Sequence, residues 1–155
     1  MRTGVEIDMV VRDSLAALAL YDKIFGIERL EATAVDRGLN EAVFTLLGTR
    51  FHLLDENPAY GLHAPKSEEG RPMWVNVAVP DVRAVFDRAV AEGCTVIQAV
   101  SGISEIGVTN AVFSDPFGYV WMLHQVYRTA SLGDRLQYMT EQPHSGGAAT
   151  DQIKQ

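Results

Sequence analysis

Apolar and polar side chains alternate along residues 5–12, which read VEIDMVVR, and again along residues 73–79, which read MWVNVAV. A period of two is typical of a β-strand that buries one face. Each segment is followed by a run with apolar residues at helical spacing, LAALALYDKIF in the first case and VRAVFDRAVA in the second. The pattern therefore predicts a strand followed by an amphipathic helix, twice.

The ends of both predicted helices carry the same residue types. Asp13 or Ser14 in the first half, and Asp81 in the second, stand where a side-chain oxygen can accept from the N–H groups of the first turn. Gly26 and Gly93 stand where each helix can end in a left-handed residue. We therefore expect capped helices at equivalent places in the two halves.

The strands that follow the helices also repeat. The segments GTRFHLLDE, from Gly48, and GYVWMLHQ, from Gly118, are both glycine-led strands. This repeat predicts an α+β fold of two βαβββ modules, with curved mixed sheets around a cavity and a short C-terminal helix.

We expect these parts to form one functional domain. The first module is expected at 1–58, a linker at 59–72, the second module at 73–127, and a C-terminal helix with a disordered tail at 128–155. Further strands are expected near 27–34, 40–47, 49–55, 94–99, 107–114 and 118–126, and the last helix near 131–141.

Strand alternation also assigns side chains to the two faces of each sheet. Val5, Ile7 and Met9 belong to an apolar face that should pack beneath a helix, as do Trp121 and Leu123. The opposite faces carry polar and aromatic side chains, which would line a cavity if the sheets curl around one. The predicted ligand-binding residues are Glu6, Asp8, Arg50, His52, Trp74, Asn76, Met122 and His124.

Composition narrows the class of protein. The chain of 155 residues is 47% hydrophobic and 21% charged, which is ordinary for a globular protein. The net charge of −7 argues against nucleic acid or an anionic membrane as a partner. The N-terminus lacks an apolar signal core, so we expect a cytoplasmic location. The single cysteine, Cys94, excludes an internal disulfide and is interpreted as a small buried hydrophobe.

The paired modules, the segment YDKIFG at the end of the first helix and the segment SDPFGYVWMLHQ resemble the vicinal oxygen chelate superfamily (glyoxalase, bleomycin resistance and dioxygenase proteins). The DPFG turn before a tryptophan-containing strand resembles its PhnB-like branch. The resemblance covers residues 4–127. It implies that two chains commonly pair, sometimes exchanging modules.

The resemblance also implies one divalent metal, held by a residue from each of four strands. The corresponding positions here are Glu6, His52, Trp74 and Met122. An indole has no available lone pair, and a thioether is a poor ligand for a hard divalent ion. The two remaining ligands are fewer than the usual three of a catalytic zinc site. We therefore predict a metal-free protein without a cofactor.

Several of these residues have more than one interpretation. Glu6 is either a general base or an exposed carboxylate. His52 is a metal ligand, a proton shuttle or a neutral side chain that lines the pocket and makes hydrogen bonds. Trp74 either stacks on a planar or cationic ligand or fills the core. Arg50 is expected to pair with Asp8 or another nearby acid rather than to clamp a substrate anion. His124 could complete an off-pattern metal site with Glu6 and His52.

The leading functional hypothesis is a metal-free small-molecule-binding protein that sequesters or senses a compact, partly aromatic or cationic ligand. The alternative is a lyase, isomerase or dioxygenase that uses Glu6, His52 and His124 with a divalent metal, or Glu6 as a general base. Glu6 and His52 are thus the candidate catalytic residues. A third hypothesis is a degenerate scaffold whose role is dimerisation.

A homodimer is expected on two grounds. The resemblance implies pairing, and the predicted C-terminal helix carries Leu132, Leu136 and Met139 on one side with no local surface to bury them. Nucleic acid and membranes are not expected partners.

Overall fold

The computed structural model describes residues 3–66 and 73–141. The first βαβββ module comprises β1 (Glu6–Val11), α1 (Ser14–Phe25), β2 (Glu28–Ala32), β3 (Glu41–Leu46) and β4 (Thr49–Asp55). After a 3₁₀ turn at Pro58–Tyr60, the second module comprises β5 (Val75–Ala78), α2 (Val82–Ala91), β6 (Thr95–Ile103), β7 (Val108–Ser114) and β8 (Val120–Val126). The last described element is α3 (Leu132–Glu141), and the tail at 143–155 that we predicted as disordered lies outside the described residues.

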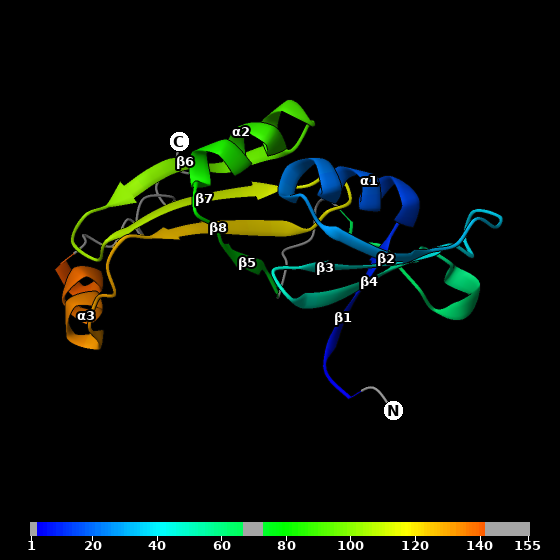
Figure 1. Ribbon diagram of the computed structural model, residues 1–155, viewed down its shortest axis with the longest axis horizontal. Coiled ribbons are helices and arrows are strands. Elements are labelled where there is room, and N and C mark those ends of the chain that lie inside the picture. Colours follow the sequence, from blue (N-terminus) through cyan, green and yellow to red (C-terminus); the bar gives the residue numbers. More distant parts are fainter. Residues whose placement is uncertain (1–2, 67–72, 142–155) are drawn as a thin grey trace, which may run out of the picture.

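The two modules have the same sheet topology. Each forms a four-stranded sheet, in the order β1-β4-β3-β2 and β5-β8-β7-β6. The first and last strands of each module run parallel, and the other neighbours are antiparallel. Figure 1 shows the two sheets side by side, with α1 and α2 along the same side of the molecule. The predicted repeat of βαβββ units is confirmed.

Both long helices begin at the predicted caps. The carboxylate of Asp13 accepts from the backbone N–H of Ala16 at 2.9 Å, and Asp81 accepts from Ala84 at 3.0 Å. Gly26 ends α1 in the left-handed region, with φ of 67°. These contacts satisfy helix-terminal groups that have no partner within the helix.

The core lies between each sheet and its helix. Met9, Leu53 and Trp121 are fully buried on the apolar strand faces, as the alternation predicted. Val5, however, was wrongly assigned to this face: it is 88% exposed. The reason is that the strand pairing starts at Glu6, opposite Arg50, so Val5 precedes the sheet.

The modules meet through aromatic side chains. The ring of Trp121, on β8, lies 5.1 Å from that of Tyr21 and 4.8 Å from that of Phe25, both on α1. The hydroxyl of Tyr119 donates to the carbonyl oxygen of Val10 at 2.9 Å. This junction uses the helix side of the sheets, and within the described residues no helix packs on their other side.

Candidate functional site

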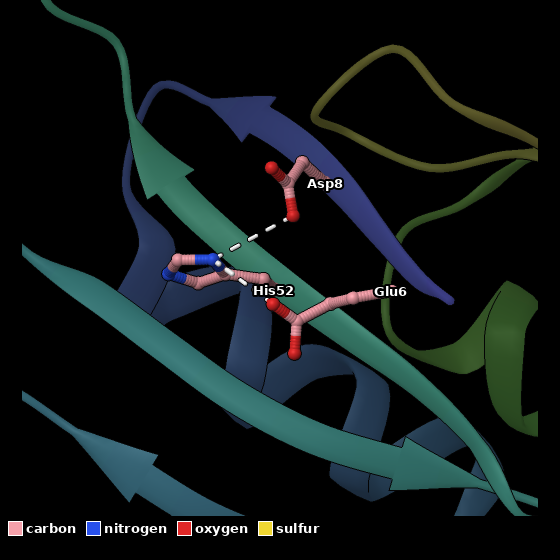
Figure 2. A group of neighbouring side chains, drawn as sticks. All are labelled: Glu6, Asp8 and His52. Atoms are coloured by element: carbon pink, nitrogen blue, oxygen red, sulfur yellow. Dashed lines mark ion pairs between the residues drawn. The ribbon is translucent and has the colours of Figure 1, made fainter. Parts of the chain in front are cut away.

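Parallel pairing of β1 and β4 builds a polar cluster in the first module. The register places Glu6 opposite Arg50 and Asp8 opposite His52. Residues two apart on a strand share a face, so these four side chains project from the side of the sheet that α1 leaves uncovered. Figure 2 shows both carboxylates turned toward the imidazole of His52.

The His52 imidazole lies among three carboxylates. Its Nδ1 atom is 3.6 Å from Oε1 of Glu6 and 3.6 Å from Oδ1 of Asp8, while Nε2 is 3.0 Å from Oε2 of Glu41. The side chains of His52 and Glu6 are 20% and 28% exposed, and that of Asp8 is 60% exposed. The cluster is therefore half-buried on the β4 side and open to solvent at Asp8.

Arg50 pairs with a nearby acid, as expected, but that acid is Glu6 and not Asp8. The Nε atom of Arg50 donates to Oε2 of Glu6, and the arginine side chain is 19% exposed. The other oxygen of Glu6, Oε1, is the one that faces His52. Arg50 thus orients the Glu6 carboxylate toward the imidazole.

A cavity of about 300 Å³ lies beside β5, which among the described residues is an edge strand of the second sheet, and residues of both modules line it. Its walls are mostly apolar, and they include Leu47, Thr49 and Phe51 from the first module and Trp74 and Asn76 from the second. Trp74 is 51% exposed, so the core-filling role that the sequence left open for it is wrong. Its indole is available to a ligand.

The second sheet carries the remaining predicted site residues. Met122 lies opposite Asn76 and His124 opposite Ala78 in the parallel pairing of β5 with β8. The Nδ1 atom of His124 is hydrogen-bonded with the side-chain oxygen of the buried Asn110, and burial lowers the pKa of His124 below its ordinary value of 6.5. Burial thus disfavours the charged form of His124, and the imidazole is held by its own sheet.

Among the described residues, the group with metal-ligating atoms close together is Glu6, Asp8 and His52, whose ligand atoms lie within 4.8 Å of one another. The structure does not bring His124 to this group. The off-pattern metal site predicted from the sequence combined Glu6 and His52 with His124. In the structure the third member of the group is Asp8.

The four positions that the fold resemblance assigns to a metal do not fit one. Trp74 and Met122, which both belong to the second module, supply no hard donor atom. The donor chemistry of the first-module group differs, because two carboxylates and an imidazole are ordinary divalent-ion ligands.

Glu41 is a residue of the cluster that sequence reasoning missed. It pairs with Leu54 across β3 and β4, while Val43 pairs with His52, so Glu41 reaches the imidazole diagonally. Only the antiparallel register of β3 and β4 could have revealed this contact. The buried Cys94 agrees with its interpretation as a small hydrophobe.

Comparisons with known proteins agree with this fold. A model of the Glyoxalase/Bleomycin resistance protein/Dioxygenase superfamily matches residues 5–123. An uncharacterized protein of Mycobacterium bovis is 30% identical over 138 residues, covering 86% of this chain and 90% of that protein. An uncharacterized protein of Mycobacterium tuberculosis (strain H37Rv) is likewise 30% identical over 138 residues, covering 86% of this chain and 81% of its own.

Solved structures confirm the predicted α+β fold. The fosfomycin resistance protein FosX of Listeria monocytogenes matches with a TM-score of 0.62 and 17% identity, over 87% of this chain and 99% of that one. A FosX mutant complexed with Mn(II) and 1S,2S-dihydroxypropylphosphonic acid also matches, with a TM-score of 0.62 and 18% identity over 90% and 99% of the two chains. TioX from Micromonospora sp. ML1 matches with a TM-score of 0.58 and 19% identity, over 80% and 98%. At these identities the likeness concerns the fold alone.

No helix in the described part of the chain is both long and apolar enough to cross a bilayer.

Proposed function

The chain belongs to the glyoxalase/bleomycin resistance protein/dioxygenase superfamily, and from that premise we propose that it is a small-molecule-binding protein. Its ligand is compact and partly aromatic or cationic, and it binds against Trp74 in the cavity between the modules. The observation that carries this proposal is a half-exposed tryptophan on the wall of a largely apolar cavity. The protein would act by sequestering or sensing the ligand.

The cavity has the properties of a small-ligand site. Its volume of about 300 Å³ is at the lower end of the range typical of such sites. Apolar side chains such as Phe51 supply contact area, and Thr49 and Asn76 supply polar groups that can fix an orientation. The face of an indole attracts both planar rings and organic cations.

Binding in this cavity needs no metal. The four-strand metal centre implied by the fold would require ligands at Trp74 and Met122, whose side chains cannot supply them. We therefore propose that this centre is not formed and that Trp74 contacts the ligand in its place.

Tryptophan fluorescence provides the test, because the chain has two tryptophans and Trp121 is fully buried. We would titrate the protein with quinoline and with N-methylquinolinium and follow both emission and thermal stability. We expect saturable quenching and a rise in the melting temperature. In Trp74→Leu the affinity should fall at least about tenfold, which corresponds to about 1.4 kcal/mol.

The matched control is Tyr60→Leu, which removes another exposed aromatic ring, 75% accessible, that does not line the cavity. It should bind both probes as the wild type does. Absence of any thermal shift with either probe, or equal affinity in Trp74→Leu, would contradict the proposal. The first of these outcomes would favour the scaffold hypothesis.

A second candidate is an enzyme, and the contact between Glu6 and His52 favours it. A carboxylate beside an imidazole can remove and return a proton, as an isomerase or lyase requires. The test is turnover of small carbonyl and epoxide substrates, with and without divalent metal. Activity that is lost in Glu6→Gln and retained in Asp87→Asn would support this candidate over simple binding.

We also propose that two chains pair. The apolar residues of α3 are Leu132, Leu136 and Met139, and they are 64%, 53% and 64% exposed. Figure 1 shows α3 standing at the far end of the second sheet. A solvent-exposed apolar stripe of this kind favours a partner surface.

The assignment to the PhnB-like branch remains a prediction, since the matching family model describes the whole superfamily. The cytoplasmic location also remains a prediction.

A further inference from the structure

The cluster on the first sheet is a second site, separate from the proposed ligand cavity. We infer that Glu6, Asp8 and His52 together bind one divalent cation within the first module, with Glu41 orienting His52. This site takes no ligand from the second module, so it differs from the four-strand centre that the fold implies. It also does not depend on the proposed small-molecule function.

The contact with Glu41 determines which nitrogen of His52 is free to ligate. A carboxylate only accepts hydrogen bonds, so at 3.0 Å the Nε2 atom of His52 is the donor to Glu41. In the tautomer that carries its proton on Nε2, Nδ1 presents its lone pair toward Glu6 and Asp8. A carboxylate that accepts from the second nitrogen of a metal-bound histidine is a common arrangement around metals.

The spacing around Nδ1 fits a bridging ion better than a direct hydrogen bond. Both carboxylate oxygens lie 3.6 Å from Nδ1. A charge-assisted N–H···O bond would bring one of them to about 2.8 Å. Ligands at about 2.1 Å from a tetrahedral ion stand about 3.4 Å apart. The two pairs that include Nδ1 are close to this separation, and the three ligand atoms together lie within 4.8 Å of one another.

The local charge also favours a divalent ion. Glu6, Asp8 and Glu41 bring three negative charges to the imidazole, and Arg50 brings one positive charge. The balance of −2 equals the charge that a divalent ion would neutralise. Because Arg50 contacts Oε2 of Glu6, the oxygen that faces His52 is Oε1.

The donor types select the class of metal. One imidazole and two carboxylates suit borderline or hard ions such as Zn²⁺ and Mn²⁺, and not soft ions such as Cu⁺. The exposed side of the site, at Asp8, leaves room for water to complete the coordination. This gives three protein ligands, the number typical of an open zinc site.

The experiment is calorimetric titration of chelator-treated full-length protein with ZnCl₂ and with MnCl₂, with electron paramagnetic resonance of bound Mn²⁺ as the second readout. We expect one ion per chain. Asp8→Asn and His52→Gln should each weaken binding at least tenfold. Glu41→Gln should weaken it by about tenfold to a hundredfold without abolishing it, as expected for a group that acts through a ligand.

Two controls separate this site from its alternatives. Asp87→Asn removes an exposed carboxylate on α2 and should leave binding unchanged. His124→Ala should also leave binding unchanged, and loss of binding in that variant would overturn the proposal in favour of a site shared between the modules.

Absence of binding by the wild type, or wild-type affinity in Asp8→Asn, would overturn the proposal as well. Because Asp8 is largely exposed, Asp8→Asn remains interpretable if His52→Gln does not fold. None of these outcomes bears on the quinoline titration of the Trp74 cavity.

Discussion

The hydroxyl of Tyr21, on α1, donates a hydrogen bond of 2.7 Å to the carboxylate of Asp115, in the turn between β7 and β8. The same oxygen, Oδ2, accepts from the indole N–H of Trp121 at 2.8 Å, and Oδ1 accepts from the backbone N–H groups of Phe117 and Tyr119. Burial raises the pKa of Asp115 above its ordinary value of 3.8, while these donors oppose the shift. One buried carboxylate therefore joins the first helix to the second module.

Removing the Tyr21 hydroxyl should weaken this junction. We expect Tyr21→Phe to lower the free energy of unfolding by about 1.5–3 kcal/mol, because the lost hydrogen bond is made to a charged group. The control is Tyr119→Phe, whose hydroxyl donates to the neutral carbonyl of Val10, and its cost should be about 0.5–1.5 kcal/mol. Urea unfolding of both variants measures the difference. A smaller loss for Tyr21→Phe than for Tyr119→Phe would contradict this account.

Asp55 should contribute to stability against acid. Its carboxylate is buried, which by itself raises the pKa, but hydrogen bonds from the backbone of Ser14, Gly38 and Asn40 bring the pKa of Asp55 below its ordinary value of 3.8. Because the pKa of Asp55 is lower in the folded protein, its ionised carboxylate stabilises the fold at pH values above the ordinary pKa. This stabilisation is lost as the pH falls through the folded-state pKa. We expect Asp55→Asn to be less stable than wild type at pH 7.

The difference between wild type and Asp55→Asn should shrink as the pH falls below about 4, because both then carry a neutral side chain at this position. Chemical unfolding at a series of pH values measures it. The control is Asp36→Asn, an exposed carboxylate in the neighbouring loop, which should stay close to wild type throughout. A difference that stays constant down to pH 2 would refute the role given to Asp55.

The thiol of Cys94 should be inert in the folded protein. Burial, with smaller contributions from the negative charges of Asp115 and Glu92, raises the pKa of Cys94 to about 12. Since the thiolate is the reactive form, we expect no reaction with a disulfide reagent at pH 8 in native conditions. In denaturant one thiol per chain should react, because the chain has a single cysteine. Rapid labelling of the native protein would show that this part of the structure is open.

The apolar side of α3 should hold two chains together. Light scattering should give a mass of twice the 17.0 kDa of one chain. Leu136→Asp should shift the protein toward the single-chain mass, because it places a charge in the apolar contact. Gln137→Asp introduces the same side chain on the polar side of α3 and should leave the dimer intact. A monomeric wild type, or a Leu136→Asp variant that stays dimeric, would contradict the role of this helix.

The sequence by itself determined the repeat, the helix caps and the sheet faces, because each depends on residues that are close along the chain. Asp13 caps the helix that follows it, and the alternation around Met9 fixes the side on which Glu6 and Asp8 project. A strand has a period of two wherever it lies, so these assignments did not need to know its neighbours.

Only the tertiary structure decided which side chains meet. The pairing of β1 with β4 brings His52 to Asp8 and Glu6, and the pairing of β3 with β4 adds Glu41, whereas His124 stays on the other sheet. The burial of Asp115 and the exposure of Trp74 likewise depend on how one module packs against the other. Local periodicity contains no information on these long-range contacts, because they arise from the packing of segments that lie far apart in the sequence.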